Sequence, residues 1–155
     1  MFTVKRLNHM VLYVRDVEKA RDFYRDVMGF TITTERPGRA AFMRANGSDN
    51  HHDLGLFQIA ADAPGPSRGD MVGLYHAAWE VATLDDLVKA REALTESGAL
   101  VGVNDHGTSL SLYAHDPSGN EFEVFWQVPR EEWDTRKGGQ LDIEGEMAKR
   151  ATATA

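Results

Sequence analysis

Two long stretches of the chain share one pattern of apolar and polar positions. The first begins with LNHMVLYV and continues with DVEKARDFYRDVMGF, and the second begins with LYHAAWEV and continues with TLDDLVKAREALTESGA. In each stretch, the opening run of Val, Leu and aromatic residues predicts a strand. The charged, amphipathic segment that follows, which starts at Asp or Thr, predicts a helix that ends at Gly29 or Gly98.

The remainder of each stretch predicts three further strands. These are FTITTER, RAAFMRA and HHDLGLFQIA in the first stretch, and ALVGVN, SLSLYAHD and EFEVFWQV in the second. The predicted fold class is therefore α+β, with two repeated βαβββ modules. We expect the first module at residues 1–63, a Pro- and Gly-rich linker at 64–73 and the second module at 74–128. The tail at 129–155 has a less regular pattern, and both packing and terminal fraying are open to it.

One histidine occupies the same place in both modules. His9 and His76 each follow a leucine by two positions within the predicted opening strand. A histidine in an apolar strand costs free energy unless its nitrogens are bonded, and a single one is most simply a satisfied core residue. Two at equivalent positions favour a pair of ligands instead. Glu121 and Glu123 alternate with apolar residues in the last strand, so each is either a third ligand or part of an exposed face.

Composition narrows the chemistry of any site. The 155 residues include no cysteine, which excludes disulfides, thiolate metal sites and cysteine nucleophiles. A formal net charge of −7 argues against nucleic acid as a partner, because phosphate binding needs clustered Lys and Arg. No apolar run approaches the about 20 residues that cross a bilayer, and the start is a poor signal peptide. We therefore expect a cytoplasmic protein with no membrane partner.

The stretch from Asn104 to Glu123 resembles the signature of type I extradiol ring-cleavage dioxygenases. These enzymes belong to the vicinal oxygen chelate superfamily, together with glyoxalase I and bleomycin resistance proteins. The signature comprises a histidine, an apolar residue with a tyrosine, an Asp-Pro-x-Gly turn and a ligand glutamate, which match His106, Leu112-Tyr113, Asp116–Gly119 and Glu123. The double histidine His51-His52 resembles a second motif of the family. The resemblance covers about residues 4 to 128.

The resemblance implies that the two modules form a metal-binding half-barrel site. It makes His9, His76 and Glu123 the metal ligands, and the spacing of its signature selects Glu123 over Glu121. Two imidazoles and one carboxylate that leave other positions open suit a non-haem Fe(II) oxygenase. Mn(II) has similar ligand preferences, and Zn(II) with a bound water is a further alternative. The implied partners are O2, a small aromatic diol such as a catechol, and a second copy of the chain in a homodimer.

The resemblance also assigns three residues to the chemistry. His52 is the acid/base residue that manages the protons of the catechol, a task that suits a pKa near neutrality. Tyr113 contacts a substrate oxygen, and His106 bonds the substrate or Tyr113 from further out. Strict strand alternation conflicts with the motif at one point, because it puts His51 rather than His52 on the face of Gly55. A β-bulge would reconcile the two.

Two other functions fit the same superfamily. A glyoxalase- or epimerase-like isomerase or lyase uses a fourth protein ligand, and a drug-binding resistance protein lacks the metal triad. An ungapped alignment of HDLGLFQ with NEFEVFW puts Gly55 opposite Glu123, where the fourth ligand would lie. Glycine has no ligating side chain, which favours the dioxygenase. A bulge at Gly55 is the simpler structural explanation of the same residue.

Overall fold

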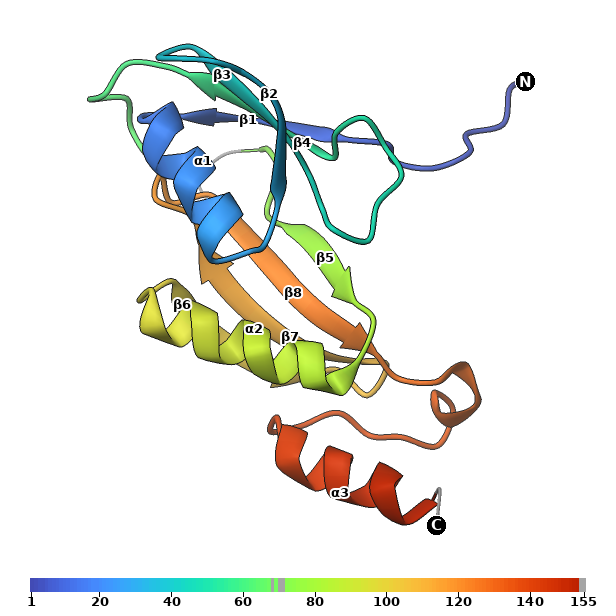
Figure 1. Cartoon of the computed structure of the whole chain (residues 1–155). Helices are drawn as coiled ribbons and strands as arrows, with labels where there is room; N and C mark the ends of the chain where they lie inside the picture. Colours follow the sequence, from blue (N-terminus) through green and yellow to red (C-terminus); the bar gives the residue numbers. More distant parts are fainter. Residues whose placement is uncertain (68, 70–71, 154–155) are drawn as a thin grey trace. The chain divides into compact units, whose positions relative to one another are not determined.

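The computed structural model describes residues 1–67, 69 and 72–153 of the chain (Figure 1). Three residues of the expected linker, Arg68, Asp70 and Met71, lie outside the described residues. The chain divides into two compact units, and each is described by itself. Unit 1 comprises Met1–Ser67 and Asp116–Asn120, and unit 2 comprises Arg68–His115 and Glu121–Ala155.

Both units contain a strand, a helix and three further strands in chain order. Unit 1 contains β1 (Met10–Val14), α1 (Val17–Asp26), β2 (Thr31–Arg36), β3 (Ala40–Arg44) and β4 (Leu54–Gln58). Unit 2 contains β5 (Ala77–Val81), α2 (Leu84–Glu96), β6 (Leu100–Asp105), β7 (Ser109–His115) and β8 (Glu121–Gln127). The sheet orders, β1-β4-β3-β2 and β5-β8-β7-β6, are the same, and the opening strand is parallel to the last in each. The predicted α+β fold with two βαβββ modules is confirmed.

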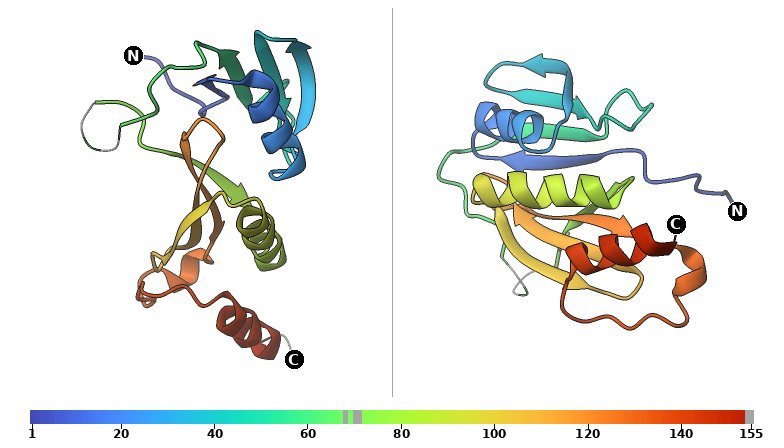
Figure 2. Two further views of the ribbon diagram at one scale, coloured as in Figure 1. Left: turned by 90° about the vertical axis from the view of Figure 1, so that its left-hand side faces the viewer. Right: turned by 60° about the horizontal axis from the view of Figure 1, so that its bottom comes forward.

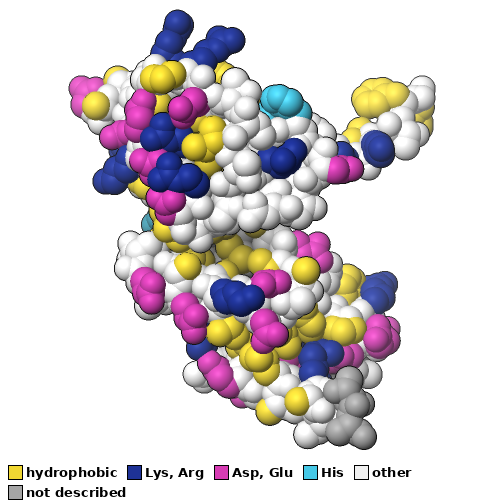
Figure 3. All heavy atoms as spheres, in the orientation of Figure 1, with side chains coloured by type: hydrophobic (Ala, Val, Ile, Leu, Met, Phe, Trp, Pro, Cys, Tyr) yellow, Lys and Arg dark blue, Asp and Glu magenta, His cyan; other side chains and the backbone are white. Residues whose placement is uncertain are grey.

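The two helices begin and end as the sequence predicts. Asp16 and Thr83 are the N-caps, and each side-chain oxygen accepts a hydrogen bond from the backbone N–H three residues later. After each helix, Gly29 and Gly98 adopt φ values of 70° and 71°, a conformation that side chains disfavour. Lys/Arg and Asp/Glu side chains are interspersed on the outer side of α1, where Arg21 pairs with Asp22 and Glu35 (Figure 3).

Each sheet buries one face against its helix. In β7, Leu110, Leu112 and Ala114 are fully buried, and successive side chains along a strand point to opposite faces. The intervening side chains of β7 therefore point away from α2. In β1, Leu12 and Val14 are buried in the same way. One face of each sheet is thus fixed by core packing, and the other is available for chemistry.

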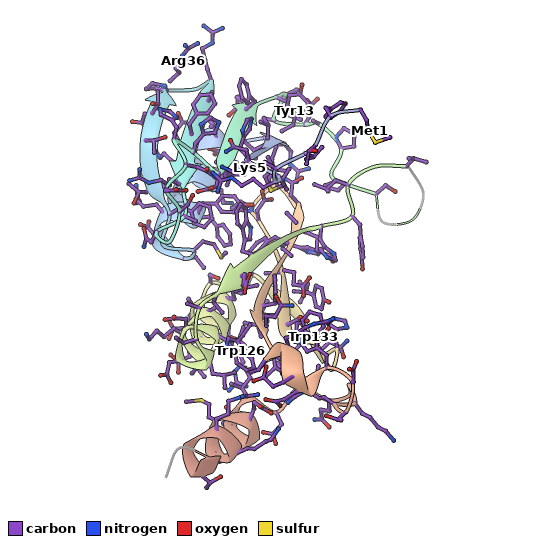
Figure 4. All side chains as sticks on the ribbon, turned by 90° about the vertical axis from the view of Figure 1, so that its right-hand side faces the viewer. Met1, Lys5, Tyr13, Arg36, Trp126 and Trp133 are labelled. Carbon is purple, nitrogen blue, oxygen red and sulfur yellow. The ribbon has the colours of Figure 1, made fainter. Side chains whose placement is uncertain are left out.

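The tail after β8 is more regular than its pattern suggested. It forms a single 3₁₀ turn, Arg130–Glu132, and then α3 (Ile143–Ala153), which contacts α2 (Figure 2). The side chain of Ile143 is fully buried, and the indole N–H of Trp133 donates to the carbonyl of Val128 at 2.7 Å (Figure 4). The tail therefore packs on unit 2. Among the described residues, no helix is long and apolar enough to cross a membrane.

The Asp-Pro-Ser-Gly part of the signature forms a turn. The buried carboxylate of Asp116 accepts hydrogen bonds from the backbone N–H groups of Ser118 and Asn120, at 2.8 and 2.9 Å. Gly119 adopts a φ of 84°, which favours glycine. Within unit 1, Arg15 donates from its guanidinium to the carbonyl of Ser118 at 2.8 Å. This part of the signature therefore shapes the chain between β7 and β8.

Candidate metal centre

Two of the three expected metal ligands contact each other in unit 2. His76 immediately precedes β5, and Glu123 lies within β8, the strand that pairs with β5. Nε2 of His76 lies 3.3 Å from Oε2 of Glu123, and their side chains are 25% and 12% exposed. The parallel register of β5 and β8 sets this approach, because it places Ala78 opposite Glu123 and so brings His76 to the start of β8.

The surroundings of His76 fit a divalent metal ion. Its Nδ1 is buried and has no hydrogen-bond partner among the described residues, and it lies 3.8 Å from Oε1 of Glu121. An imidazole that binds a metal through one nitrogen commonly turns its other nitrogen toward a carboxylate. The contact between Nε2 and the Glu123 carboxylate is short enough for both atoms to bind one ion. With His76 protonated, the same contact is an ion pair.

The third expected ligand, His9, belongs to unit 1. It immediately precedes β1, as His76 precedes β5, so both histidines lie just before their strands rather than within them. The ring of His9 lies 4.7 Å from the ring of His52, and its Nδ1 is 2.9 Å from the side-chain oxygen of Asn8. Within the described residues of either unit, no group of three His, Asp or Glu side chains is arranged to hold a metal ion. The three-ligand set stays a prediction.

The histidine pair lies in a loop, and the predicted strand began too early. β4 starts at Leu54, so strand alternation does not apply to His51 and His52. His52 packs 4.7 Å from the His9 ring and 5.1 Å from the Phe42 ring. The pairing of β3 with β4 is regular, so the β-bulge that we invoked is absent between these strands. The loop itself brings His52, the second histidine of the motif, next to His9.

The loop also sets the protonation of His52. Burial lowers the pKa of His52, and electrostatic interaction with the neighbouring imidazoles of His9 and His51 lowers it further. A neutral imidazole that can accept a proton is therefore favoured at neutral pH.

Asp53 holds the loop in place by accepting hydrogen bonds from the N–H of Ala45, the hydroxyl of Ser48 and the amide of Asn50 at 2.9, 2.8 and 2.6 Å.

The strand registers confirm that Gly55 occupies the place of Glu123. Val11 and Ala78 each lie two residues after the equivalent histidine, and they are paired with Gly55 and Glu123, respectively. The pairing is continuous at Gly55, so no bulge explains the glycine. A Cβ atom added there would lie 3.3 Å from Val11 and 3.6 Å from the ring of Phe42. Unit 1 therefore places no side-chain ligand at this position.

Tyr113 and His106 form a hydrogen-bonded pair on the face of the sheet that carries Glu123. Tyr113 is paired with Glu123 across β7 and β8, and its hydroxyl lies 2.6 Å from Nε2 of His106. The Asn104 amide nitrogen lies 3.0 Å from Nδ1 of His106 and 3.4 Å from its Nε2, and the tautomer in which Nδ1 accepts from the amide places the ring proton on Nε2. In that tautomer, Nε2–H donates to the Tyr113 oxygen and leaves the hydroxyl hydrogen for a ligand. Burial and the charge of Glu123 raise the pKa of Tyr113, which keeps the hydroxyl protonated.

Sequence reasoning weighed Glu121 as a third ligand or part of an exposed face and did not anticipate its contact with His115. The Glu121 side chain is 4% exposed, and its Oε2 lies 3.4 Å from Nε2 of His115, while its Oε1 faces His76. The antiparallel pairing of β7 with β8 places His115 directly opposite Glu121. The Asp-Pro-Ser-Gly-Asn turn could have revealed this contact, because a turn of that length fixes which residues face each other across the hairpin.

The family model and two similar curated relatives place the chain in the same protein family. Residues 6–124 match the model of the glyoxalase/bleomycin resistance protein/dioxygenase superfamily. The chain is 30% identical over 150 residues to a catechol-2,3-dioxygenase of Bacillus subtilis, covering 90% of this chain and 50% of that protein. It is 32% identical over 132 residues to biphenyl-2,3-diol 1,2-dioxygenase 3 of Rhodococcus globerulus, covering 80% of this chain and 64% of that protein.

The fold is shared more widely than the sequence. A lactoylglutathione lyase from Agrobacterium tumefaciens matches with a TM-score of 0.61 at 22% identity, covering 79% of this chain and 94% of that chain. The two dioxygenase relatives are longer, and this chain spans 50% of one and 64% of the other. Members of the matched family bind divalent metal ions. The chain belongs to the glyoxalase/bleomycin resistance protein/dioxygenase superfamily.

Proposed function

We propose that this chain is a non-haem Fe(II)-dependent extradiol dioxygenase that acts on a small aromatic diol. The observation that carries the proposal is the contact of His76 with Glu123 on the sheet face that also presents the Tyr113–His106 pair. The names of the two relatives, a catechol dioxygenase and a biphenyl-diol dioxygenase, support the same substrate class. His9 completes the proposed ligand set.

The proposed reaction balances without a further reductant. Both atoms of O2 enter the substrate, and the ring C–C bond next to the diol breaks, so that catechol gives a hydroxymuconic semialdehyde. Iron(II), which His9, His76 and Glu123 would hold, would supply the redox chemistry that joins the diol and O2.

The protein's own residues hold the diol and move its protons. The Tyr113 hydroxyl hydrogen, which is not used by His106, is available to donate to a diol oxygen. His106 keeps that hydroxyl oriented through its Nε2–H. His52, which burial and its neighbours keep neutral, accepts a proton from the diol and returns it to the product. This division of tasks needs a neutral His52 and a protonated Tyr113, which are the states that their pKa shifts favour.

A metal-dependent isomerase or lyase is the second candidate, and a drug-binding resistance protein is the third. The fold likeness to the lyase concerns the fold alone, because fold does not determine chemistry. Gly55 argues against the isomerase, since the position that corresponds to Glu123 offers no fourth ligand. Mn(II) and Zn(II) are the alternative metals, and the homodimer and the cytoplasmic location stay predictions.

The deciding experiment combines metal analysis with a substrate panel. Protein purified without oxygen is loaded with Fe(II), Mn(II) or Zn(II) and mixed with catechol, methylcatechols or 2,3-dihydroxybiphenyl. We expect oxygen uptake and a coloured ring-opened product with Fe(II), and none with Zn(II), which cannot pass electrons to O2. Full iron occupancy without uptake on any diol would contradict the proposal. Isomerisation of a hemithioacetal by the Zn(II)-loaded protein would favour the second candidate.

A further inference from the structure

The C-terminal tail reaches the end of β6 through one arginine. Nη2 of Arg136 lies 2.8 Å from Oδ2 of Asp105, and Nη1 lies 2.6 Å from Oε2 of Glu146 in α3. The three side chains are 14%, 12% and 6% exposed, so solvent and salt screen this bridge less than a surface ion pair. A planar guanidinium held by two carboxylates has a fixed orientation. Arg136 therefore ties α3 to the last residue of β6.

The side chain of Asp105 reaches past the next residue, His106, and contacts Gly107. Its Oδ1 accepts a hydrogen bond from the backbone N–H of Gly107 at 2.7 Å, while its Oδ2 binds Arg136. The backbone of Asp105 also exchanges two hydrogen bonds with Gly139, at 3.2 and 2.8 Å. A Cβ atom on Gly138 would lie 2.5 Å from the carbonyl oxygen of Asp105, so the tail packs here with no space for a side chain. The residues on both sides of His106 are held through the tail.

His106 depends on this backbone for its position. Asp105 is the last residue of β6 and its carboxylate contacts Arg136 of the tail, whereas the His106 ring contacts Asn104 and Tyr113. The His106 ring is exposed, and it meets the Tyr113 hydroxyl at 2.6 Å. An exposed side chain loses conformational entropy when it is held in one orientation. A fixed backbone lowers this entropy cost, because it limits the orientations that the His106 ring can adopt.

We propose that Arg136 is a positioning residue for the His106–Tyr113 pair. It acts through the Asp105 carboxylate, which sets the backbone at Asp105 and Gly107 and thereby directs the His106 ring toward the Tyr113 hydroxyl. The effect on turnover rests on the proposed dioxygenase function, whereas the effect on the His106 ring does not. The tail that carries Arg136 lies outside the residues matched by the family model.

The test compares two arginines of the tail. Arg150 pairs with Glu146 at 2.6 Å and Glu132 at 2.9 Å and lies over the Trp126 ring, so Arg150→Met removes tail contacts of similar number. In Arg136→Met we expect a shifted or broadened ¹H–¹⁵N signal of the His106 ring, assigned with His106→Ala. Amide hydrogen exchange at Gly107 should accelerate about tenfold or more. In Arg150→Met the His106 signal should stay in place, even where the melting temperature falls equally.

Turnover supplies the third measurement. Arg136→Met should lower kcat on a diol, and this loss should disappear in the His106→Ala background, because the two residues act in one chain of contacts. An unchanged His106 signal in Arg136→Met, or an equal change in Arg150→Met, would overturn the proposal. If Arg136→Met does not fold, Arg136→Lys, which can reach one carboxylate, must give a smaller change of the same kind. A shifted His106 signal in a protein that turns over no diol would count against the dioxygenase alone.

Discussion

The two units hold an acid at the same position of the same fold, and they use it differently. Asp53 directly precedes Leu54, which is paired with Met10 of β1, and Glu121 directly precedes Phe122, which is paired with Ala77 of β5. Both acids are 9% exposed. In unit 1, donors from the preceding loop surround the Asp53 carboxylate. In unit 2, the carboxylate lies between two imidazoles. The first acid therefore builds a loop, and the second lies where it can orient a ligand.

The residues paired with Gly55 in β3 and with Glu123 in β7 also differ, apolar in unit 1 and polar in unit 2. Phe42 in unit 1 corresponds to Tyr113 in unit 2, because both are paired with the residue that is glycine in one unit and Glu123 in the other. Beside them in unit 1, Tyr13 and Phe57 are exposed aromatic residues. The buried faces are alike because each packs under a helix, whereas the opposite faces carry no such constraint. A duplicated fold can thus keep one core and place most of its polar chemistry in one copy.

The largest expected effect comes from removing the carboxylate that unit 1 lacks. Glu123→Ala should abolish metal binding and nearly all turnover, because one of the three proposed ligands and its charge are lost. Gly55→Ala is the matched change in unit 1. It should leave the metal content unchanged and lower the stability slightly, since the new Cβ lies 3.3 Å from Val11. Metal analysis after dialysis measures both, and full metal content in Glu123→Ala would remove Glu123 from the ligand set.

The next effect separates the two adjacent histidines of unit 1. His52→Ala should lower turnover on a diol by about 10²-fold or more while the metal stays bound, the size expected for a lost general acid/base. His51→Ala should cost far less, because it is His52 that packs against His9 and Phe42. Steady-state kinetics of both variants at equal metal content decide the matter. A larger loss in His51→Ala would show that the wrong histidine has been assigned.

The equivalent acids can be compared directly. Glu121→Ala should weaken metal binding by about 10- to 100-fold, as expected when the carboxylate behind a metal-binding imidazole is removed. Asp53→Ala should weaken metal binding less, because Asp53 contacts loop donors and no proposed ligand. Competition with a chelator, using Zn(II) as the probe, measures the two dissociation constants. Equal affinities in Glu121→Ala and the unchanged protein would mean that Glu121 does not act through His76.

Tyr113→Phe gives unit 2 the phenylalanine that unit 1 already has. We expect kcat/KM for a diol to fall by roughly tenfold, about 1.4 kcal/mol, because one hydrogen bond to the substrate is lost while the ring is kept. Metal content and melting temperature should stay the same. If the variant retains full activity, the Tyr113 hydroxyl does not contact the diol.

The sequence predicted the features that follow from local patterns, such as strands, helices and their ends. It did not predict the features that depend on contacts between residues far apart in the chain. Both modules and their helix ends followed from apolar periodicity and from the caps Asp16 and Thr83. The sequence pattern placed the histidine pair in a strand. The pair lies in a loop instead, because Asp53 accepts hydrogen bonds that close the loop, and a pattern of alternating apolar and polar residues carries no information about such bonds. The bridge from Arg136 to Asp105 joins residues 31 positions apart, and no periodic signal marks it.

The smallest effect concerns the acid of unit 1 and depends on pH. Burial raises the pKa of Asp53, but hydrogen bonds from Ser48, Asn50 and Ala45 outweigh it, so the pKa in the folded protein lies below its usual value. A carboxyl group with a lowered folded pKa contributes stability above its unfolded pKa, about 3.9, and loses it as the pH falls through the folded pKa.

Asp53→Asn should therefore unfold more easily than the unchanged protein by about 1–3 kcal/mol at pH 7, because an amide offers one acceptor where the loop presents three donors. The difference should shrink as the pH falls below about 4, where the unfolded chain takes up a proton at Asp53, and through the lower pKa of Asp53 in the folded protein. Asp49→Asn is the control, since this neighbouring side chain is 91% exposed and should show no such difference. Urea unfolding between pH 3 and 7 measures the free energies. A gap that stays constant over this range would show that shape, rather than charge, accounts for the stabilisation by Asp53, and the contrast with Glu121 would then lose its electrostatic basis.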